Sequence, residues 1–174
     1  MMEKNIVLVG FMGTGKSTLG RALAKRLGCR FVDTDLAIEE ITGLSVAQIF
    51  RRHGAIRFRS EENLLAKRLA GQFGLVIATG GGMLLNSANV ELLKKNGVLI
   101  ELRAEPDVIV NRVKNKKHRP LLKKGDLSET VTGLLREREG VYDAAEFAVD
   151  TGQLSFAAAL NVVHNYLKKK GYIK

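Results

Sequence analysis

Short apolar runs alternate along the chain with longer stretches in which apolar residues recur at helical spacing. The runs hold four or five residues, many of them β-branched, which is typical of buried strands. The longer stretches place apolar residues three or four positions apart, as amphipathic helices do. This alternation predicts an α/β fold, in which a parallel sheet is covered by crossover helices. The expected strands lie at 6–9, 30–33, 75–79, 98–102 and 147–150.

Helix-capping signals mark several ends of the helical stretches. Gly28 follows the first helix where a terminal glycine is expected, and Ser45 with Gln48 has the spacing of a capping box. The expected helices cover 16–27, 36–41, 45–53, 56–70, 89–95, 106–113, 128–141 and 155–167. On their buried faces we expect Leu64, Leu65, Leu69, Val131, Leu134 and Leu135.

Composition sets limits on the class of protein. The 174 residues suit one domain, and 45% hydrophobic with 26% charged residues is normal for a globular chain. No apolar run has transmembrane length, the start has no signal-peptide pattern, and a single cysteine, Cys29, excludes an internal disulfide. We therefore expect a cytoplasmic protein with one domain, residues 1–174, a half-buried free thiol and no membrane contact.

The chain is strongly basic, with a net charge of +10 from 28 basic and 18 acidic residues. A basic excess can serve nucleic acid or a small anionic substrate. Trp is absent and Tyr numbers only 3, so the aromatic side chains on which bases stack are scarce. We therefore interpret the charge as serving partly solubility and partly the attraction of phosphates and a carboxylate, and no nucleic-acid partner is expected. A nucleotide-gated nucleic-acid-binding protein is the alternative from another class.

The segment 10–18, Gly-Phe-Met-Gly-Thr-Gly-Lys-Ser-Thr, fits the phosphate-binding loop G-x-x-x-x-G-K-[ST]. It follows a predicted strand and opens a predicted helix, which is the order that the motif requires. Its glycines let backbone N–H groups point at phosphate oxygens, and the helix adds its positive end. Lys16 can reach the β- and γ-phosphates and Ser17 can ligate Mg²⁺. This context disfavours the alternative, a glycine-rich turn with a chance lysine.

Two further groups of residues follow predicted strands. Asp33 and Asp35 are two positions apart, a spacing that points both carboxylates the same way in extended backbone. One suits a water on Mg²⁺ and the other an acceptor hydroxyl, although Asp35 can instead cap the next helix. Gly80-Gly81-Gly82 allows a ligand to approach the backbone closely, the alternative being a loose turn. Ligands of such sheets bind at the carboxyl ends of strands, so these groups predict one site.

The arginines are ambiguous by themselves. Arg59 and Arg138 stand beside glutamates on predicted helices, where solvated charges are commoner than ligand contacts. The stretch 114–125 is highly basic and weakly periodic, and we expect a mobile surface loop that serves as a lid. Within it Arg119 precedes Pro120, and an arginine stiffened in this way can close on ATP phosphates.

Together these motifs resemble the shikimate kinase family over nearly the whole chain, from 6 to about 151. The combination is far more specific than the phosphate loop alone, which many NTPases share. The matching segments are 10–18, Phe31-Val32-Asp33-Thr34-Asp35, Phe58-Arg59 with Glu62, Gly80-Gly81-Gly82, Arg119-Pro120-Leu121-Leu122, Arg138 with Tyr142, and Val149-Asp150-Thr151. The resemblance implies the P-loop NTPase fold of small-molecule and nucleoside monophosphate kinases. That fold is a five-stranded parallel sheet flanked by helices, here with a substrate-binding helical region at about 36–62 and a lid at about 114–125.

The resemblance also implies an activity, the transfer of the γ-phosphoryl group of MgATP to the 3-hydroxyl of shikimate. This reaction belongs to the chorismate pathway of aromatic amino-acid biosynthesis. The catalytic residues implied are Lys16, Asp35 and Arg119, and the Mg²⁺ ligands are Ser17 and, through water, Asp33. ATP is expected at Gly13, Thr14, Gly15, Lys16, Ser17, Thr18, Arg112 and Arg119. Shikimate is expected at Asp35, Arg59, Gly80, Gly81, Gly82 and Arg138, with the two arginines on its carboxylate. A monomer is expected.

The chain departs from the family's pattern at few positions. Ala55 and Gly140 stand where the family often has a glutamate and a proline, and neither position carries chemistry. The segment 152–154 lacks an arginine expected near the adenine, so no adenine contact is assigned. A gluconate or nucleotide kinase of similar fold and a non-catalytic sensor are the alternatives. The paired aspartates and the intact Lys16 argue against them.

Overall fold

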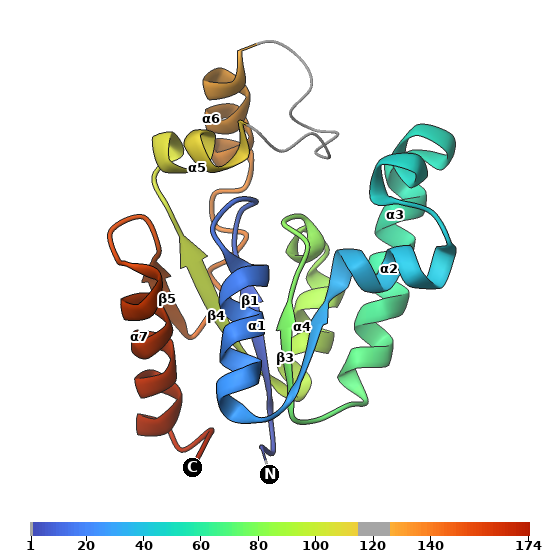
Figure 1. Cartoon of the computed structure of the whole chain (residues 1–174). Coiled ribbons are helices and arrows are strands. Elements are labelled where there is room, and N and C mark those ends of the chain that lie inside the picture. Colours follow the sequence, from blue (N-terminus) through green and yellow to red (C-terminus); the bar gives the residue numbers. More distant parts are fainter. Residues whose placement is uncertain (1, 115–125) are drawn as a thin grey trace.

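Five parallel strands form one sheet in the order β2-β3-β1-β4-β5 (Figure 1). This computed structural model describes residues 2–114 and 126–174. The strands are β1 (Asn5–Val9), β2 (Arg30–Asp33), β3 (Leu75–Ala78), β4 (Gly97–Arg103) and β5 (Phe147–Asp150). In the central strand β1, Ile6 lies opposite Val76 of β3 and Val98 of β4. The predicted five-stranded parallel sheet is therefore confirmed, and the phosphate loop follows its central strand.

Helices cover both faces of the sheet, because alternate residues of a strand point to opposite sides. On one face Leu8 packs in a core with Leu23 of α1 (Lys16–Leu27) and Val163 of α7 (Phe156–Lys169). On the other face Val7 packs in a core with residues of α2 (Thr34–Thr42), α3 (Val46–Ala70) and α4 (Ser87–Lys95). Each fully buried aliphatic side chain stabilises the fold by about 1.5–3 kcal/mol.

A third, smaller core lies above the carboxyl ends of the strands. It joins Phe11 and Met12 of the phosphate loop to Ile109 and Val113 of α5 (Pro106–Val113) and to Val131 of α6 (Leu127–Glu137). In Figure 1, α5 and α6 stand over one half of this edge of the sheet, and α2 with the start of α3 stands over the other half. Both termini lie at the opposite edge. The phosphate loop is thus anchored in apolar contacts from below and from one side.

Most predicted helix ends are confirmed. Gly28 closes α1 in the left-handed conformation, and Ser45 and Gln48 form the reciprocal hydrogen bonds of a capping box. The helices predicted at 45–53 and 56–70 are joined across a kink at Gly54, whose φ is 78° and ψ is 177°. The half-buried Cys29 was also expected.

Several details of the prediction are wrong. α6 ends at Glu137, because Arg138 leaves the helical conformation with φ −106° and ψ 12°, and turns follow. Leu134 and Leu135 are half-buried and pack against the third core. Leu64 is 49% exposed, because α3 covers the sheet with a narrow apolar stripe. α4 begins at Ser87, two residues before the predicted start, because Asn86 provides its cap.

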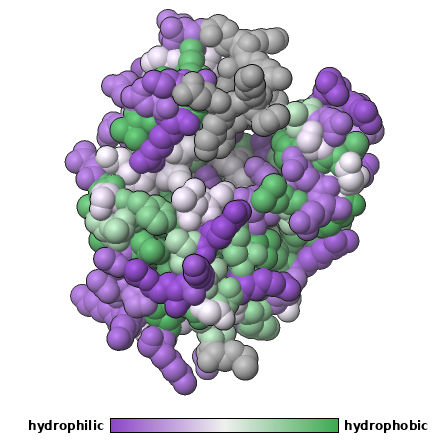
Figure 2. Space-filling view, in the orientation of Figure 1, coloured by the Kyte–Doolittle hydropathy of each residue, from purple (hydrophilic) through white to green (hydrophobic). Residues whose placement is uncertain are grey.

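Hydrophilic and hydrophobic residues are both exposed on the surface. Figure 2 shows the two kinds side by side on this face of the molecule. Within the described residues, no helix is long and apolar enough to cross a membrane. The predicted lid at 114–125 lies outside the described residues, apart from Lys114 at the end of α5.

Candidate active site

The phosphate loop has the backbone that its glycines predict. Gly10, Gly13 and Gly15 have φ values of 136°, 80° and 97°, a region that other residues rarely adopt. α1 begins directly after the loop, at Lys16, so its positive end faces the loop. Lys16 is 8% exposed, and its ammonium group donates to the carbonyls of Gly10 and Phe11, each at 2.8 Å. The cation is therefore held against the loop that would receive a polyphosphate.

A cleft of about 390 Å³ opens at this loop. Its wall includes every residue that was predicted to bind the nucleotide, apart from Arg119, which lies outside the described part of the chain. The predicted residues that line it are Gly13, Thr14, Gly15, Lys16, Ser17, Thr18, Asp33, Asp35, Gly80, Gly81 and Arg112. The strand ends that the sequence marked thus meet at one cavity, as expected.

The two aspartates face this cleft by a different geometry from the predicted one. Asp33 ends β2 and caps α2, since its Oδ1 accepts the backbone N–H groups of Asp35 and Leu36 at 3.1 and 3.4 Å. Its Oδ2 accepts the Ser17 hydroxyl at 2.5 Å. Asp35 lies in the first turn of α2, so the extended-backbone argument was wrong. The capping role falls to Asp33, while Asp35 remains directed at the cleft.

Arg112 reaches the cleft from α5 and is fixed there by the chain that follows β5. Its guanidinium donates to the carbonyl of Gly13 at 3.2 Å and to the hydroxyl and carbonyl of Thr151 at 3.0 and 2.6 Å. The Thr151 hydroxyl in turn donates to the carbonyl of Thr14 at 2.7 Å. Thr151 therefore ties the phosphate loop to Arg112, a role that no local pattern indicated.

Side chains from other elements lie very close to the backbone of the triple glycine that follows β3. A Cβ atom on Gly80 would overlap Asp35, one on Gly81 would lie 3.1 Å from Nη1 of Arg138, and one on Gly82 would lie 2.5 Å from the Arg59 guanidinium. None of the three has a positive φ. Side chains of the protein therefore approach these glycines closely, and the expected approach of a ligand stays a prediction.

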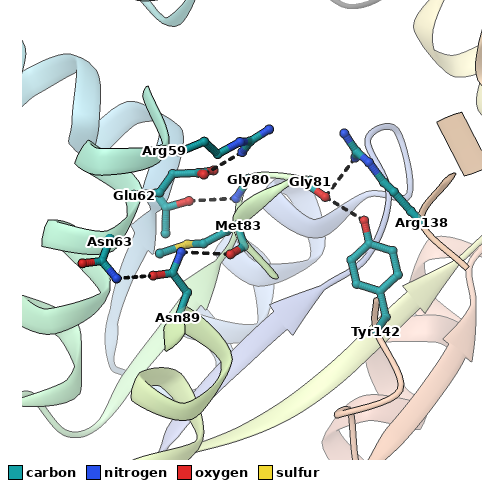
Figure 3. A network of polar contacts seen from close by, with 10 residues as sticks. Arg59, Glu62, Asn63, Gly80, Gly81, Met83, Asn89, Arg138 and Tyr142 are labelled. Atoms are coloured by element: carbon teal, nitrogen blue, oxygen red, sulfur yellow. Dashed lines mark hydrogen bonds and ion pairs between the residues drawn. The ribbon is translucent and has the colours of Figure 1, made fainter. Parts of the chain in front are cut away.

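Arg59 and Arg138 reach this glycine loop from opposite sides (Figure 3). The Arg59 guanidinium donates to Glu62 at 2.6 Å, and the Arg138 guanidinium donates to the carbonyl of Gly81 at 2.9 Å. The Arg138 group also lies 5.1 Å from the centroid of the Phe11 ring in the phosphate loop. Two cations therefore flank the loop beside the phosphate cleft, an arrangement suited to a carboxylate. Neither arginine is among the residues that line the cleft itself.

Glu62 is fully buried beneath Arg59. Burial raises the pKa of Glu62 to about 7, and the hydrogen bond and charge of Arg59 oppose this rise. Its Oε1 is a buried oxygen without a hydrogen-bond partner among the described residues, and it lies near Gly80. Desolvation is the larger effect because the side chain has only 1% of its surface exposed.

Several site residues were missed by sequence reasoning. Leu154 and Phe156 form an apolar part of the cleft wall although 36% and 50% of their surfaces remain exposed. The Thr34 hydroxyl accepts the Gly80 N–H at 2.8 Å, and the Tyr142 hydroxyl donates to the Gly81 carbonyl at 2.7 Å. Thr34 and Tyr142 stand in segments that match the family, although the resemblance gave them no role. No pattern marked Leu154 or Phe156.

A phosphate loop on the central strand, joined to a cleft with carboxylates and arginines, defines a P-loop kinase that acts on a small molecule. The sequence model of the shikimate kinase family matches residues 12–168. The chain therefore belongs to the shikimate kinase family, and the predicted family, fold and enzyme class are confirmed.

Individual relatives agree over the full length. The shikimate kinase of Pelotomaculum thermopropionicum is 61% identical across 98% of this chain and 99% of its own. That of Desulforudis audaxviator is 50% identical across 98% and 90%. The solved structure of shikimate kinase from Acinetobacter baumannii in complex with shikimate has a TM-score of 0.90 at 35% identity, and covers 96% of this chain and 94% of its own. These matches favour this family over the gluconate and nucleotide kinases and over a nucleic-acid-binding protein.

Proposed function

We propose that the protein transfers the γ-phosphoryl group of MgATP to the 3-hydroxyl of shikimate, giving shikimate 3-phosphate and ADP in aromatic amino-acid biosynthesis. One observation carries the acceptor assignment: Gly80, Gly81 and Gly82 each contact one of Asp35, Arg138 and Arg59, directly beside the phosphate loop. This supports an acceptor with one carboxylate and hydroxyl groups, held next to a polyphosphate. Shikimate has this chemistry.

The nucleotide is proposed to lie in the 390 Å³ cleft, with its phosphates on the loop 10–18. Backbone N–H groups and the start of α1 would hold the phosphate oxygens, and Lys16 would neutralise charge on the β- and γ-phosphates. Arg112 would contact the phosphate side from α5. The base would lie toward Leu154 and Phe156, because these residues give the cleft its apolar wall. These two residues are therefore proposed as the adenine contacts, which the sequence left unassigned.

Mg²⁺ is proposed to bind at Ser17 and, through water, at Asp33. The residues fit the ion, since a hydroxyl and a carboxylate meet at 2.5 Å on the cleft wall and offer the oxygen ligands that Mg²⁺ prefers. Ser17 and Asp33 would hold the ion at the phosphate loop, where it would supply positive charge that neutralises part of the phosphate charge. Asp33 is held in place for this role by the two backbone N–H groups that it caps.

Asp35 is proposed to accept the hydrogen bond of the 3-hydroxyl and to take its proton. The hydroxyl oxygen then forms a bond to the γ-phosphorus as the bond to the β–γ bridging oxygen breaks, and ADP leaves. Arg59 and Arg138 would hold the carboxylate and fix the reacting oxygen in line with that bond. Lys16 and Arg112 would stabilise the charge that develops, together with Arg119, which remains a prediction from the family motif.

The remaining assignments are also proposals. A single domain over 1–174 agrees with one continuous sheet and its cores, and a helical substrate region at about 36–62 agrees with α2 and the start of α3. A monomer stays a prediction from the sequence. A cytoplasmic location agrees with the free Cys29 and with a pathway whose substrates are small anions.

The direct test is ADP production from MgATP with and without shikimate, beside gluconate and nucleoside monophosphates as competing acceptors. We expect ADP production to rise when shikimate is added and not when gluconate or a nucleoside monophosphate is added. Arg138→Ala should raise the shikimate KM about 100-fold, because a buried charge-assisted contact contributes about 3 kcal/mol, while the ATP KM stays within a factor of two or so. Arg136→Ala is the matched control, since Arg136 is exposed on α6 two residues earlier. A rise with another acceptor, or a collapse of ATP affinity in Arg138→Ala, would overturn the acceptor assignment.

A further inference from the structure

The carbonyl of Gly81 accepts two hydrogen bonds from side chains. One comes from Nη1 of Arg138 at 2.9 Å and the other from the hydroxyl of Tyr142 at 2.7 Å (Figure 3). A carbonyl oxygen has two lone pairs, so this pair of donors satisfies it. The orientation of the Gly81 peptide is therefore fixed by two residues that lie 57 and 61 positions away in the chain.

Tyr142 is a rigid donor. Its side chain belongs to the core that covers the β1 and β3 face of the sheet, and the residue is 9% exposed. A packed tyrosine ring has only two side-chain torsions, so its hydroxyl has a fixed position once the ring is buried. Burial also raises the pKa of Tyr142, an effect that Arg138 partly offsets. The hydroxyl therefore keeps its proton over the physiological pH range.

Arg138 is less well anchored by its own backbone. It follows the last residue of α6 and lies in a turn closed by a hydrogen bond from the Val141 N–H to the Arg138 carbonyl at 3.1 Å. Its guanidinium contacts the Gly81 carbonyl and the Phe11 ring, and it also interacts with the Tyr142 side chain. The Gly81 carbonyl and Tyr142 therefore both help to fix where the guanidinium lies. A guanidinium has several N–H donors, so it can hold this carbonyl and a carboxylate together.

We propose that Tyr142 is a positioning residue for the acceptor carboxylate: it helps to fix the Arg138 guanidinium, both through the Gly81 carbonyl that they share and through its own interaction with Arg138. Tyr142 is not proposed to touch either substrate. The inference rests on the proposed function, because it assigns Arg138 to the carboxylate of shikimate. It adds a residue of the hydrophobic core to the determinants of acceptor affinity.

The test is Tyr142→Phe, which removes one hydroxyl and keeps the packed ring. We expect kcat/KM for shikimate to fall about tenfold with the ATP KM unchanged, since a neutral buried hydrogen bond contributes at most about that factor. Tyr172→Phe is the matched control, because its hydroxyl bonds Glu146 at 2.8 Å near the carboxyl terminus. The proposal would be overturned if Tyr142→Phe lowered kcat/KM equally for shikimate and for ATP, or if it changed neither value. If wild-type protein phosphorylated no shikimate, the proposed function would fail instead, so the two failures are distinguishable.

A double-mutant cycle separates positioning from a general structural effect. If Tyr142 acts through Arg138, then Tyr142→Phe should have almost no further effect on kcat/KM for shikimate in an Arg138→Ala background. This ratio is measured from the initial slope of rate against shikimate concentration, so saturation is not required. A tenfold loss that persists in the Arg138→Ala background would contradict action through Arg138.

Discussion

Gly82→Ala is expected to weaken the use of the acceptor strongly without unfolding the protein. The new Cβ would lie 2.5 Å from both Nη1 and Nη2 of Arg59 and 2.8 Å from its Cζ. Real Cβ contacts begin near 3.4 Å, so the guanidinium would have to retreat by roughly 1 Å. Arg59 can do this cheaply, because its side chain is long and 30% exposed. Gly82 has φ −108° and ψ 3°, which an alanine can adopt.

The expected costs to stability and to function therefore differ greatly. We expect the free energy of unfolding to change by less than about 1 kcal/mol, because only the end of a flexible side chain moves. Displacement of a substrate-positioning group by roughly 1 Å costs about 100-fold in rate or affinity. The shikimate kcat/KM should consequently fall about 100-fold, while the ATP KM stays close to that of the wild type.

The assay is steady-state ADP release with each substrate varied in turn, together with urea unfolding. Gly133→Ala on α6 is the matched control, because its Cβ would meet nothing within 4 Å and it lies inside a helix. That variant should keep full activity and gain up to about 1 kcal/mol of stability. An unchanged shikimate kcat/KM in Gly82→Ala would refute the placement of Arg59 at the carboxylate. A gross loss of stability would refute the claim that only Arg59 must move.

Two other predictions concern buried polar groups. Burial raises the pKa of Glu62 from 4.5 to about 7, so the stability that it contributes is fully present below pH 4.5 and is lost as the pH rises through 7. Relative to Glu62→Gln, the wild-type free energy of unfolding should fall by about 3 kcal/mol between pH 4.5 and 8, and a pH-independent difference in urea unfolding would contradict this cause. Thr151→Val removes the hydrogen bonds to Thr14 and Arg112, so the ATP KM should rise about tenfold while the shikimate KM changes little. Isothermal titration with an ATP analogue checks the same effect on binding, and equal affinities for both proteins would exclude this role.

Local features of the sequence determined the order of the elements and the phosphate site. Strand runs, the loop 10–18 and the caps at Gly28 and Ser45 depend on neighbours within a few residues, and the structure confirms them. The family motifs likewise marked Asp33 and Asp35 as site residues. Their positions at strand ends were enough to predict a common cleft, because parallel strands present their carboxyl ends at one edge.

The tertiary structure decided how these residues meet. Asp35 lies in helix α2, Asp33 caps that helix, and Arg138 follows the last residue of α6. The reason for three consecutive glycines lay in side chains that come from other elements. Such contacts join groups far apart in the chain, and no local spacing encodes them.

Tyr142 illustrates the difference between what the sequence determines and what the tertiary structure determines. The sequence shows a tyrosine four residues after an arginine, and the family motif gives it no chemistry. Only packing against the sheet fixes its ring, and only then does its hydroxyl meet a carbonyl 61 residues away. The sequence by itself determined which loop holds phosphate, because that geometry is local. The tertiary structure decided how the acceptor end is held, because burial and long-range hydrogen bonds place its side chains.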